Sequence, residues 1–179
     1  MKKIVMIVIL TSIGITNTFA QTQKKDSGFY AEVGYMQASY SESVASFNNG
    51  MAALKAGYNI DKNFAVEGLI AGNTGSASFN IGTTAVSAQV QSAYGLYGKG
   101  TVELNETVGL YAKAGFTNGT VSASSRFGSG YSSGTSASYG AGIQANLTKD
   151  VYANLDYMSY YNKDGISITG PSISFGYKF

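Results

Sequence analysis

Six charged residues are the positions of this chain best suited to chemistry, because each lies in a segment that otherwise alternates apolar with small or polar residues. They are Glu32, Lys55, Glu67, Lys99, Lys113 and Asp156. Three are acidic and three are basic, and all lie well inside their segments. An unpaired buried charge costs several kcal/mol, so a closed interior needs such a balance of signs. We therefore predict that the six form one charge-paired network inside the protein.

Other catalytic groups are scarce in this sequence. The chain contains no histidine and no cysteine. The first absence removes the commonest general base at neutral pH, and the second excludes disulfides, thiolate metal sites and a lipid anchor on cysteine. A serine activated by Lys55, Lys99 or Lys113 is the nucleophile that the sequence leaves open. Ion pairing accounts for these lysines more simply, so we expect no enzyme, no cofactor and no metal.

Eight segments with the period-two alternation of β-strands position these charges. The predicted strands are 29–40, 51–60, 64–71, 86–102, 108–117, 138–147, 151–161 and a last one that follows Thr169 and ends at Phe179. Three connections are short polar turns, namely 61–63, 103–106 and 148–150. Four are longer and mostly polar, namely 41–49, 72–84, 118–135 and 162–169. This alternation of short and long connections predicts an all-β, eight-stranded, antiparallel up-and-down barrel with both termini at the short-turn end.

Each predicted strand has one face almost free of charge and one face that holds the mid-strand charges. In the last strand the apolar face consists of Ile173, Phe175, Tyr177 and Phe179. A soluble barrel or sandwich would bury this face, whereas a membrane barrel turns it toward lipid. The balanced charges, the small residues between large ones on the polar face, and two bands of tyrosine and phenylalanine on the apolar face favour the membrane barrel.

The first 20 residues have the features of a secretory signal peptide. Lys2 and Lys3 precede an apolar core, and a small-x-small site ends at Ala20, so we predict cleavage before Gln21. A transmembrane helix is the alternative, but the apolar stretch is short and interrupted by polar residues. Without Lys2 and Lys3, ten basic residues balance ten acidic ones. We therefore predict a signal peptide at 1–20, one barrel domain at 21–179, and no nucleic-acid partner.

Four glycine-aromatic segments together resemble a known family. They are Gly28 to Tyr35, Tyr94 to Lys99, Gly109 to Phe116 and Ser174 to Phe179. In order and spacing they are similar to the small OmpA/OmpX-type outer-membrane β-barrels. The resemblance implies a transmembrane barrel in the bacterial outer membrane, with short periplasmic turns and longer extracellular loops. It also implies that Phe179, with Tyr177 and Phe175, is read by the barrel-assembly machinery. Lipid-modifying members of such barrels use a histidine, which this chain lacks.

The functional hypothesis is a non-enzymatic, monomeric outer-membrane protein that acts in the cell envelope and displays loops for surface interaction around a charge-paired lumen. A small porin-like channel is the alternative, and a lipid-modifying enzyme is a third class. The expected partners are outer-membrane lipid, the assembly machinery during biogenesis, and a surface ligand held by the loops. Loop aromatics are candidate contacts for such a ligand. They are Phe47, Phe79, Phe127 and Tyr131.

Overall fold

The computed structural model describes residues 28–179 except 44, 76, 82–83 and 126–127. The predicted signal peptide and the cleavage site at Ala20 and Gln21 lie outside the described residues. Within them the chain forms nine strands: β1 (Gly28–Glu42), β2 (Ala45–Asn59), β3 (Phe64–Asn73), β4 (Ala77–Ile81), β5 (Thr84–Glu103), β6 (Val108–Ser125), β7 (Gly128–Asn146), β8 (Val151–Lys163) and β9 (Ile166–Lys178). No helix in this part of the chain is long and apolar enough to cross a membrane.

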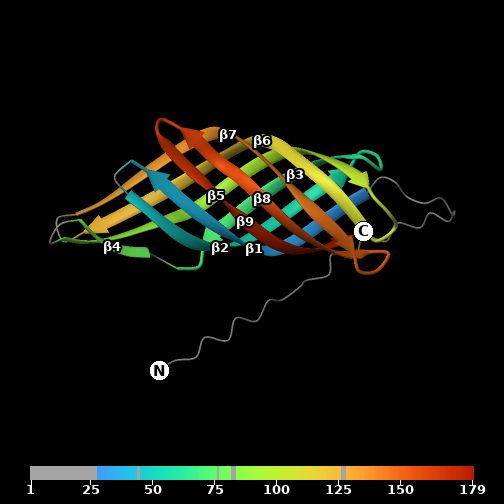
Figure 1. The fold of residues 1–179 in the computed structure, drawn as a ribbon, viewed down its shortest axis with the longest axis horizontal. Coiled ribbons are helices and arrows are strands. Elements are labelled where there is room, and N and C mark those ends of the chain that lie inside the picture. The colour runs from blue at the N-terminus through green and yellow to red at the C-terminus, as the bar shows by residue number, and fades with distance from the viewer. Residues whose placement is uncertain (1–27, 44, 76, 82–83, 126–127) are drawn as a thin grey trace, which may run out of the picture.

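The strands close into a barrel in which all paired neighbours are antiparallel (Figure 1). The order β3-β2-β1-β9-β8-β7-β6-β5-β4 is closed by pairing of β3 with β5. β3 and β4 pair with successive parts of β5. The pairing of β3 ends at Gly72↔Ser92, and the pairing of β4 begins at Ala77↔Ala88, nearer the start of β5. β4 is therefore a continuation of the β3 position, and the barrel has eight strand positions around its wall. This confirms the predicted eight-stranded antiparallel barrel.

The three short turns share one construction. In the first, the Asp61 carboxylate accepts bonds from the main-chain N–H groups of Asn63 and Phe64, at 2.7 and 2.8 Å. Asn105 and Thr148 accept the corresponding pairs of bonds in the other two turns. A short polar side chain that captures the following N–H groups stabilises a tight turn locally. The predicted turns are therefore confirmed, and they fix the register of the strands on either side.

The opposite end of the barrel differs from the prediction, because most of its length is strand rather than irregular loop. β1 and β2 pair as far as Glu42↔Ala45, and β6 and β7 as far as Ser125↔Gly128. β8 and β9 turn at Asp164 and Gly165, both with positive φ, the usual form of a two-residue hairpin turn. Serine, threonine and glycine predict irregular loops here, but a paired neighbouring strand supplies the main-chain hydrogen bonds that keep such residues in a strand.

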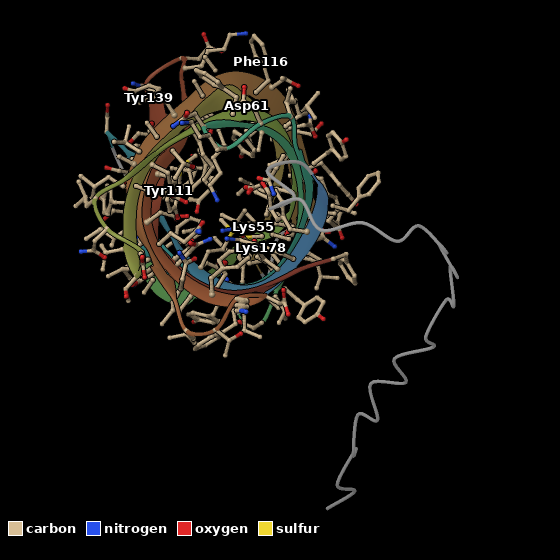
Figure 2. The ribbon with its side chains drawn as sticks, turned by 90° about the vertical axis from the view of Figure 1, so that its right-hand side faces the viewer. Lys55, Asp61, Tyr111, Phe116, Tyr139 and Lys178 are labelled. Atoms are coloured by element: carbon tan, nitrogen blue, oxygen red, sulfur yellow. The ribbon has the colours of Figure 1, made fainter. Side chains whose placement is uncertain are left out.

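The side chains alternate between an apolar outer wall and a filled interior. The ten aromatic residues of the two predicted bands all face outward, with exposed fractions between 42% and 69%. They are Phe29, Tyr58, Phe64, Tyr177 and Phe179 near the short turns, and Tyr35, Tyr94, Phe116, Tyr139 and Tyr157 toward the other end. Figure 2 shows Phe116 and Tyr139 pointing away from the barrel, and Lys55 and Tyr111 pointing into it. The predicted orientation of the two faces is therefore confirmed.

One predicted face is wrong in the part of β5 that lies toward the end of the barrel opposite the short turns. The alternation of the predicted strand 86–102 puts Val90 on the apolar outer face and Gln91 on the polar inner face, but Val90 is buried and Gln91 is exposed. The pairing of β5 with β6 shifts register between Val90 and Ser92. A β-bulge adds one residue to a strand, so every position beyond it changes face. The alternation in the lower part of β5, around Lys99, is unaffected.

Candidate functional site

The six charged residues converge in the lower half of the interior, toward the short-turn end. They form an alternating series in which each acid contacts a lysine and the inner members contact two partners. The order is Glu67, Lys113, Asp156, Lys55, Glu32 and Lys99, and the successive nitrogen–oxygen distances are 2.9, 3.3, 3.5, 3.4 and 3.9 Å. We call this series the ion-pair chain. All six residues are at least 94% buried.

The register of the strands explains why the ion-pair chain crosses the lumen. Glu32 and Lys55 lie directly opposite each other on β1 and β2. Lys99 and Lys113 are also directly opposite, on β5 and β6, where like charges repel. Their acidic partners come instead from other strands, so that Lys113 reaches Asp156 on β8 and Lys99 reaches Glu32 on β1. The ion-pair chain therefore joins walls of the barrel that have no main-chain pairing with each other.

Inward tyrosines complete the hydrogen bonding of the carboxylates. Each donates its hydroxyl at 2.8 to 3.0 Å: Tyr30 to Glu67, Tyr111 to Asp156 and Tyr152 to Glu32. Ser174 and Asn154 also donate to Glu32, both at 2.8 Å, and Ser172 donates to Asp156. Within the described residues the only buried side-chain oxygen or nitrogen without a partner is Asn154 Oδ1. Such satisfaction is what makes buried charge tolerable.

Each of these tyrosines lies opposite a glycine on the neighbouring strand. The cross-strand pairs are Tyr30↔Gly57, Tyr111↔Gly142 and Tyr152↔Gly176. A Cβ added at any of the three glycines would come within 2.6 Å of the facing ring. The ring therefore occupies the space that a side chain would otherwise fill. These tyrosines are not among the residues predicted from sequence, although a tyrosine on the polar face with a glycine at the facing position is a signal for them.

Lys99 ends the ion-pair chain and faces a water-accessible cavity. Its ammonium nitrogen lies 3.4 Å from Gln144 Oε1 and 4.5 Å from the centre of the Tyr111 ring. Below it, a cavity of about 1110 Å³ opens at the short-turn end and is lined by Tyr152 and Lys178 among others. We call this cavity the vestibule. It ends at Lys99, which is 5% exposed.

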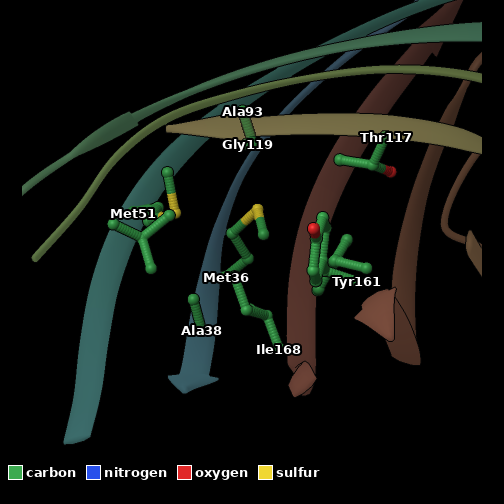
Figure 3. Close-up of a pocket in the computed structure, with 10 residues that line it drawn as sticks. Met36, Ala38, Met51, Ala93, Thr117, Gly119, Tyr161 and Ile168 are labelled. Atoms are coloured by element: carbon green, nitrogen blue, oxygen red, sulfur yellow. The ribbon is translucent and has the colours of Figure 1, made fainter. Parts of the chain in front are cut away.

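The upper half of the interior is apolar. Met36, Met51, Met158 and Val90 are all at most 2% exposed and belong to one packed cluster with Tyr160. Figure 3 shows Met36 and Met51 side by side within it. The residual cavity here is about 10 Å³, room for about one water molecule. Above the vestibule, the described part of the interior therefore holds two successive layers, one charged and one apolar.

The predicted assembly residues lie on the outer wall. Phe175, Tyr177 and Phe179 are about half to two-thirds exposed, and the Tyr177 and Phe179 rings meet edge to face at 5.2 Å. The Phe179 main-chain N–H donates to the Phe29 carbonyl at 2.9 Å, so the end of the chain is fixed to β1. Their role in assembly stays a prediction.

The loop aromatics divide between two outcomes. Phe47 is buried and stacks on Tyr40 with ring centres 4.7 Å apart, so its prediction as an exposed contact is wrong. Phe47 continues the inward alternation of β2 beyond Asn49 and Met51, so its ring joins the apolar layer. Tyr131 is 72% exposed, as predicted. The side chains of Phe79 and Phe127 lie outside the described part of the structure.

A closed barrel with an apolar exterior and charges sealed inside is the architecture of a transmembrane β-barrel. The chain belongs to the family described as outer membrane protein beta-barrel domain, which matches residues 6–179. The protein is therefore a bacterial outer-membrane barrel, with its short turns in the periplasm and its long hairpins outside the cell. Aromatic bands at both edges of the apolar wall fit this setting.

Solved structures show the same fold at low sequence identity. Ail of Yersinia pestis, in complex with the heparin analogue sucrose octasulfate, has a TM-score of 0.65 and 24% identity, covering 86% of this chain and 99% of that one. Neisserial surface protein A has a TM-score of 0.66 and 19% identity, with 86% and 99% covered. OprG of Pseudomonas aeruginosa has a TM-score of 0.55 and 11% identity, with 85% and 96% covered. No curated protein sequence is significantly similar to this chain.

Proposed function

We propose that this protein is a non-enzymatic barrel that does not conduct and that presents its long extracellular hairpins for surface interaction. The observation that carries the proposal is the filling of the lumen by two layers in series. An ion or solute would have to separate the ion-pair chain and then pass the apolar layer, where the cavity beside Met36, Met51 and Tyr160 is about 10 Å³. Partly satisfied buried charges are strongly unfavourable, so opening the charged layer is costly.

The channel alternative rests on the vestibule. Its volume of about 1110 Å³ gives periplasmic solutes access as far as Lys99. A conducting state would require the rings and methionines above Lys99 to move. In that state Lys99 would lie in the permeation path, and its charge would set the ion selectivity.

Conductance in planar bilayers tests the proposal. The folded protein, verified by heat-modifiable gel mobility, should give no discrete openings under conditions in which a general porin does. Discrete openings would support the channel instead. Lys99→Gln should then change their size or selectivity more than Lys62→Gln, since Lys62 lies at the rim of the same vestibule.

Ail binds a sulfated sugar analogue, but this chain does not offer the charge for a similar ligand. The extracellular stretches 36–51, 72–93, 117–138 and 159–170 carry four charged residues. They are Glu42, Arg126, Lys163 and Asp164, which sum to zero. Binding of a polyanion depends on clustered basic groups. We therefore propose that the surface ligand of this protein is not a sulfated polyanion.

Two further parts of the proposal concern biogenesis and assembly state. The outward aromatic residues of β9, ending at Phe179, lie on the wall where a membrane-embedded assembly machine could reach them. Since the strand edges around the lower barrel are paired, the wall offers no open edge there for a second copy. We propose recognition of Phe179 during assembly and a monomeric mature barrel.

A further inference from the structure

The β6–β7 hairpin continues as a regular ladder beyond the apolar wall. Its pairing runs without interruption from Asn118↔Thr135 to Ser124↔Ser129. At about 3.3 Å per residue these six steps extend about 20 Å along the strand. Because the register is continuous, alternate residues stay on one face throughout.

The interior contacts of the hairpin establish which residues face outward. On β6, Thr117 is buried and bonded to Tyr97, and Val121 packs against the apolar layer. On β7, Ser136 and Ser138 are buried. The even residues of 118–124 and the odd residues of 129–135 therefore point away from the barrel. We call these eight side chains the hydroxyl face.

The composition of the hydroxyl face is unusual for a solvent-exposed surface. It consists of four serines, two threonines, one asparagine and one tyrosine, with no charge. On β5, Ser87 lies opposite Ser124 and extends it. A protein surface in water normally carries charge at about a quarter to a third of its positions.

Neutral sugars fit this chemistry. Hydroxyl and amide groups both donate and accept hydrogen bonds, as sugar hydroxyls do. Tyr131, which is 72% exposed and faces Ser122, supplies a flat ring against which the C–H face of a sugar can pack. Phosphate and sulfate groups would instead need cations, which the hydroxyl face lacks.

The position of the hydroxyl face indicates where those sugars come from. It continues the outer wall directly above Phe116 and Tyr139, which mark the upper edge of the lipid-facing wall. The layer next to it is the head-group region of the outer leaflet, which in bacterial outer membranes contains glycolipid. We propose that the hydroxyl face binds the neutral core sugars of outer-leaflet glycolipid, with Tyr131 as the central contact. The inference does not depend on whether the lumen conducts.

The absence of tryptophan from this chain makes a direct test available. Tyr131→Trp places a single reporter on the hydroxyl face, and Ser132→Trp places one on the opposite face of the same strand. Both variants are refolded into vesicles containing lipopolysaccharide with its core sugars, lipopolysaccharide reduced to lipid A, or phosphatidylcholine only. Acrylamide quenching and emission maximum are then measured, with heat-modifiable mobility as the folding control.

With core sugars present, the quenching constant of Tyr131→Trp should fall at least twofold and its emission should shift to the blue, while Ser132→Trp stays unchanged. Equal behaviour of the two reporters, or no difference between lipids, would overturn the proposal. So would protection by lipid A alone, which would indicate contact with acyl chains or phosphates. Protection by free core oligosaccharide in phosphatidylcholine vesicles, as strong as that by the lipopolysaccharide, would show a soluble glycan to be the ligand and would overturn the membrane source.

A charge on either face of the hairpin sharpens the test. In the Tyr131→Trp background, Ser133→Glu places a carboxylate on the hydroxyl face and Ser132→Glu places it on the back. We expect Ser133→Glu to remove most of the protection by core sugars and Ser132→Glu to retain it. Retention in both variants would contradict binding on the hydroxyl face.

Discussion

The two halves of the barrel interior are filled by opposite chemistries. The lower half holds the ion-pair chain, with every carboxylate bonded to at least one lysine and to a tyrosine. The upper half holds buried methionines, alanines and aromatic rings. Above the vestibule, the charged layer is held together by directional bonds and the apolar layer by close packing.

This difference determines how strongly a substitution in each half should destabilise the barrel. Burying charges has a large desolvation cost, which the ion-pair chain offsets only when all its members are present. Apolar packing loses stability in proportion to the volume removed, and flexible methionines can partly refill a gap. Removal of one side chain should therefore lower the free energy of unfolding more in the lower half than in the upper half.

Removal of Asp156 should have the largest effect. Asp156 contacts both Lys55 and Lys113, so Asp156→Ala leaves two buried ammonium groups short of an acid. We expect a loss of about 3–5 kcal/mol in the free energy of unfolding. Urea unfolding in lipid vesicles measures it.

The end of the ion-pair chain provides the comparison for Asp156. Lys99→Gln removes a charge whose nearest acid is 3.9 Å away, so it should cost less than half as much. Lys99→Glu instead places a carboxylate beside Glu32 and should destabilise the barrel as severely as Asp156→Ala. If Lys99→Glu melts at the wild-type temperature, the ion-pair chain has no role in stability.

Truncation in the upper half should have the next largest effect. Met51→Ala removes a fully buried side chain from the apolar layer and should cost about 2–4 kcal/mol. Leu54→Ala, on the same strand but 61% exposed on the outer wall, is the matched control and should cost less. An equal or larger loss for Leu54→Ala would mean that the apolar layer is not tightly packed.

A glycine substitution probes the packing that supports the tyrosines. A Cβ at Gly57 would lie 2.3 Å from the Tyr30 ring, which must then move away from Glu67. Gly57→Ala should cost about 1–3 kcal/mol, the usual range for overpacking. At Gly68 the nearest atom is 3.8 Å away, so Gly68→Ala should change the urea midpoint little. Similar midpoints for the two variants would show that the ring can shift without loss.

The sequence was sufficient for the eight strand positions, the short turns and the inward charges, because each has a local signal. The period-two alternation predicts the inner and outer face of each strand, and a short polar residue such as Asp61 predicts a turn. The tyrosine–glycine pairs were missed because they depend on the register between strands, as in Tyr30↔Gly57. The bulge beside Val90 has no such signal. The strand structure of the long hairpins was not predicted because glycine and serine have a low intrinsic preference for strands. Pairing with a neighbouring strand offsets that low preference.

Deletion of Phe179 should distinguish the stability of the folded barrel from the efficiency of its assembly in cells. Phe179 lies on the outer wall, where its main-chain N–H bonds to Phe29 and its ring meets the ring of Tyr177. Loss of one main-chain hydrogen bond and one edge-to-face contact should lower the unfolding free energy by about 1–2 kcal/mol at most. The yield of folded barrel in cells should fall far more than this, if assembly requires the terminal residue. These two contacts are not part of the ion-pair chain or the apolar layer. Protein refolded in vitro without Phe179 should therefore unfold at nearly the wild-type urea concentration. An unchanged cellular yield of heat-modifiable barrel would show that assembly does not read this residue.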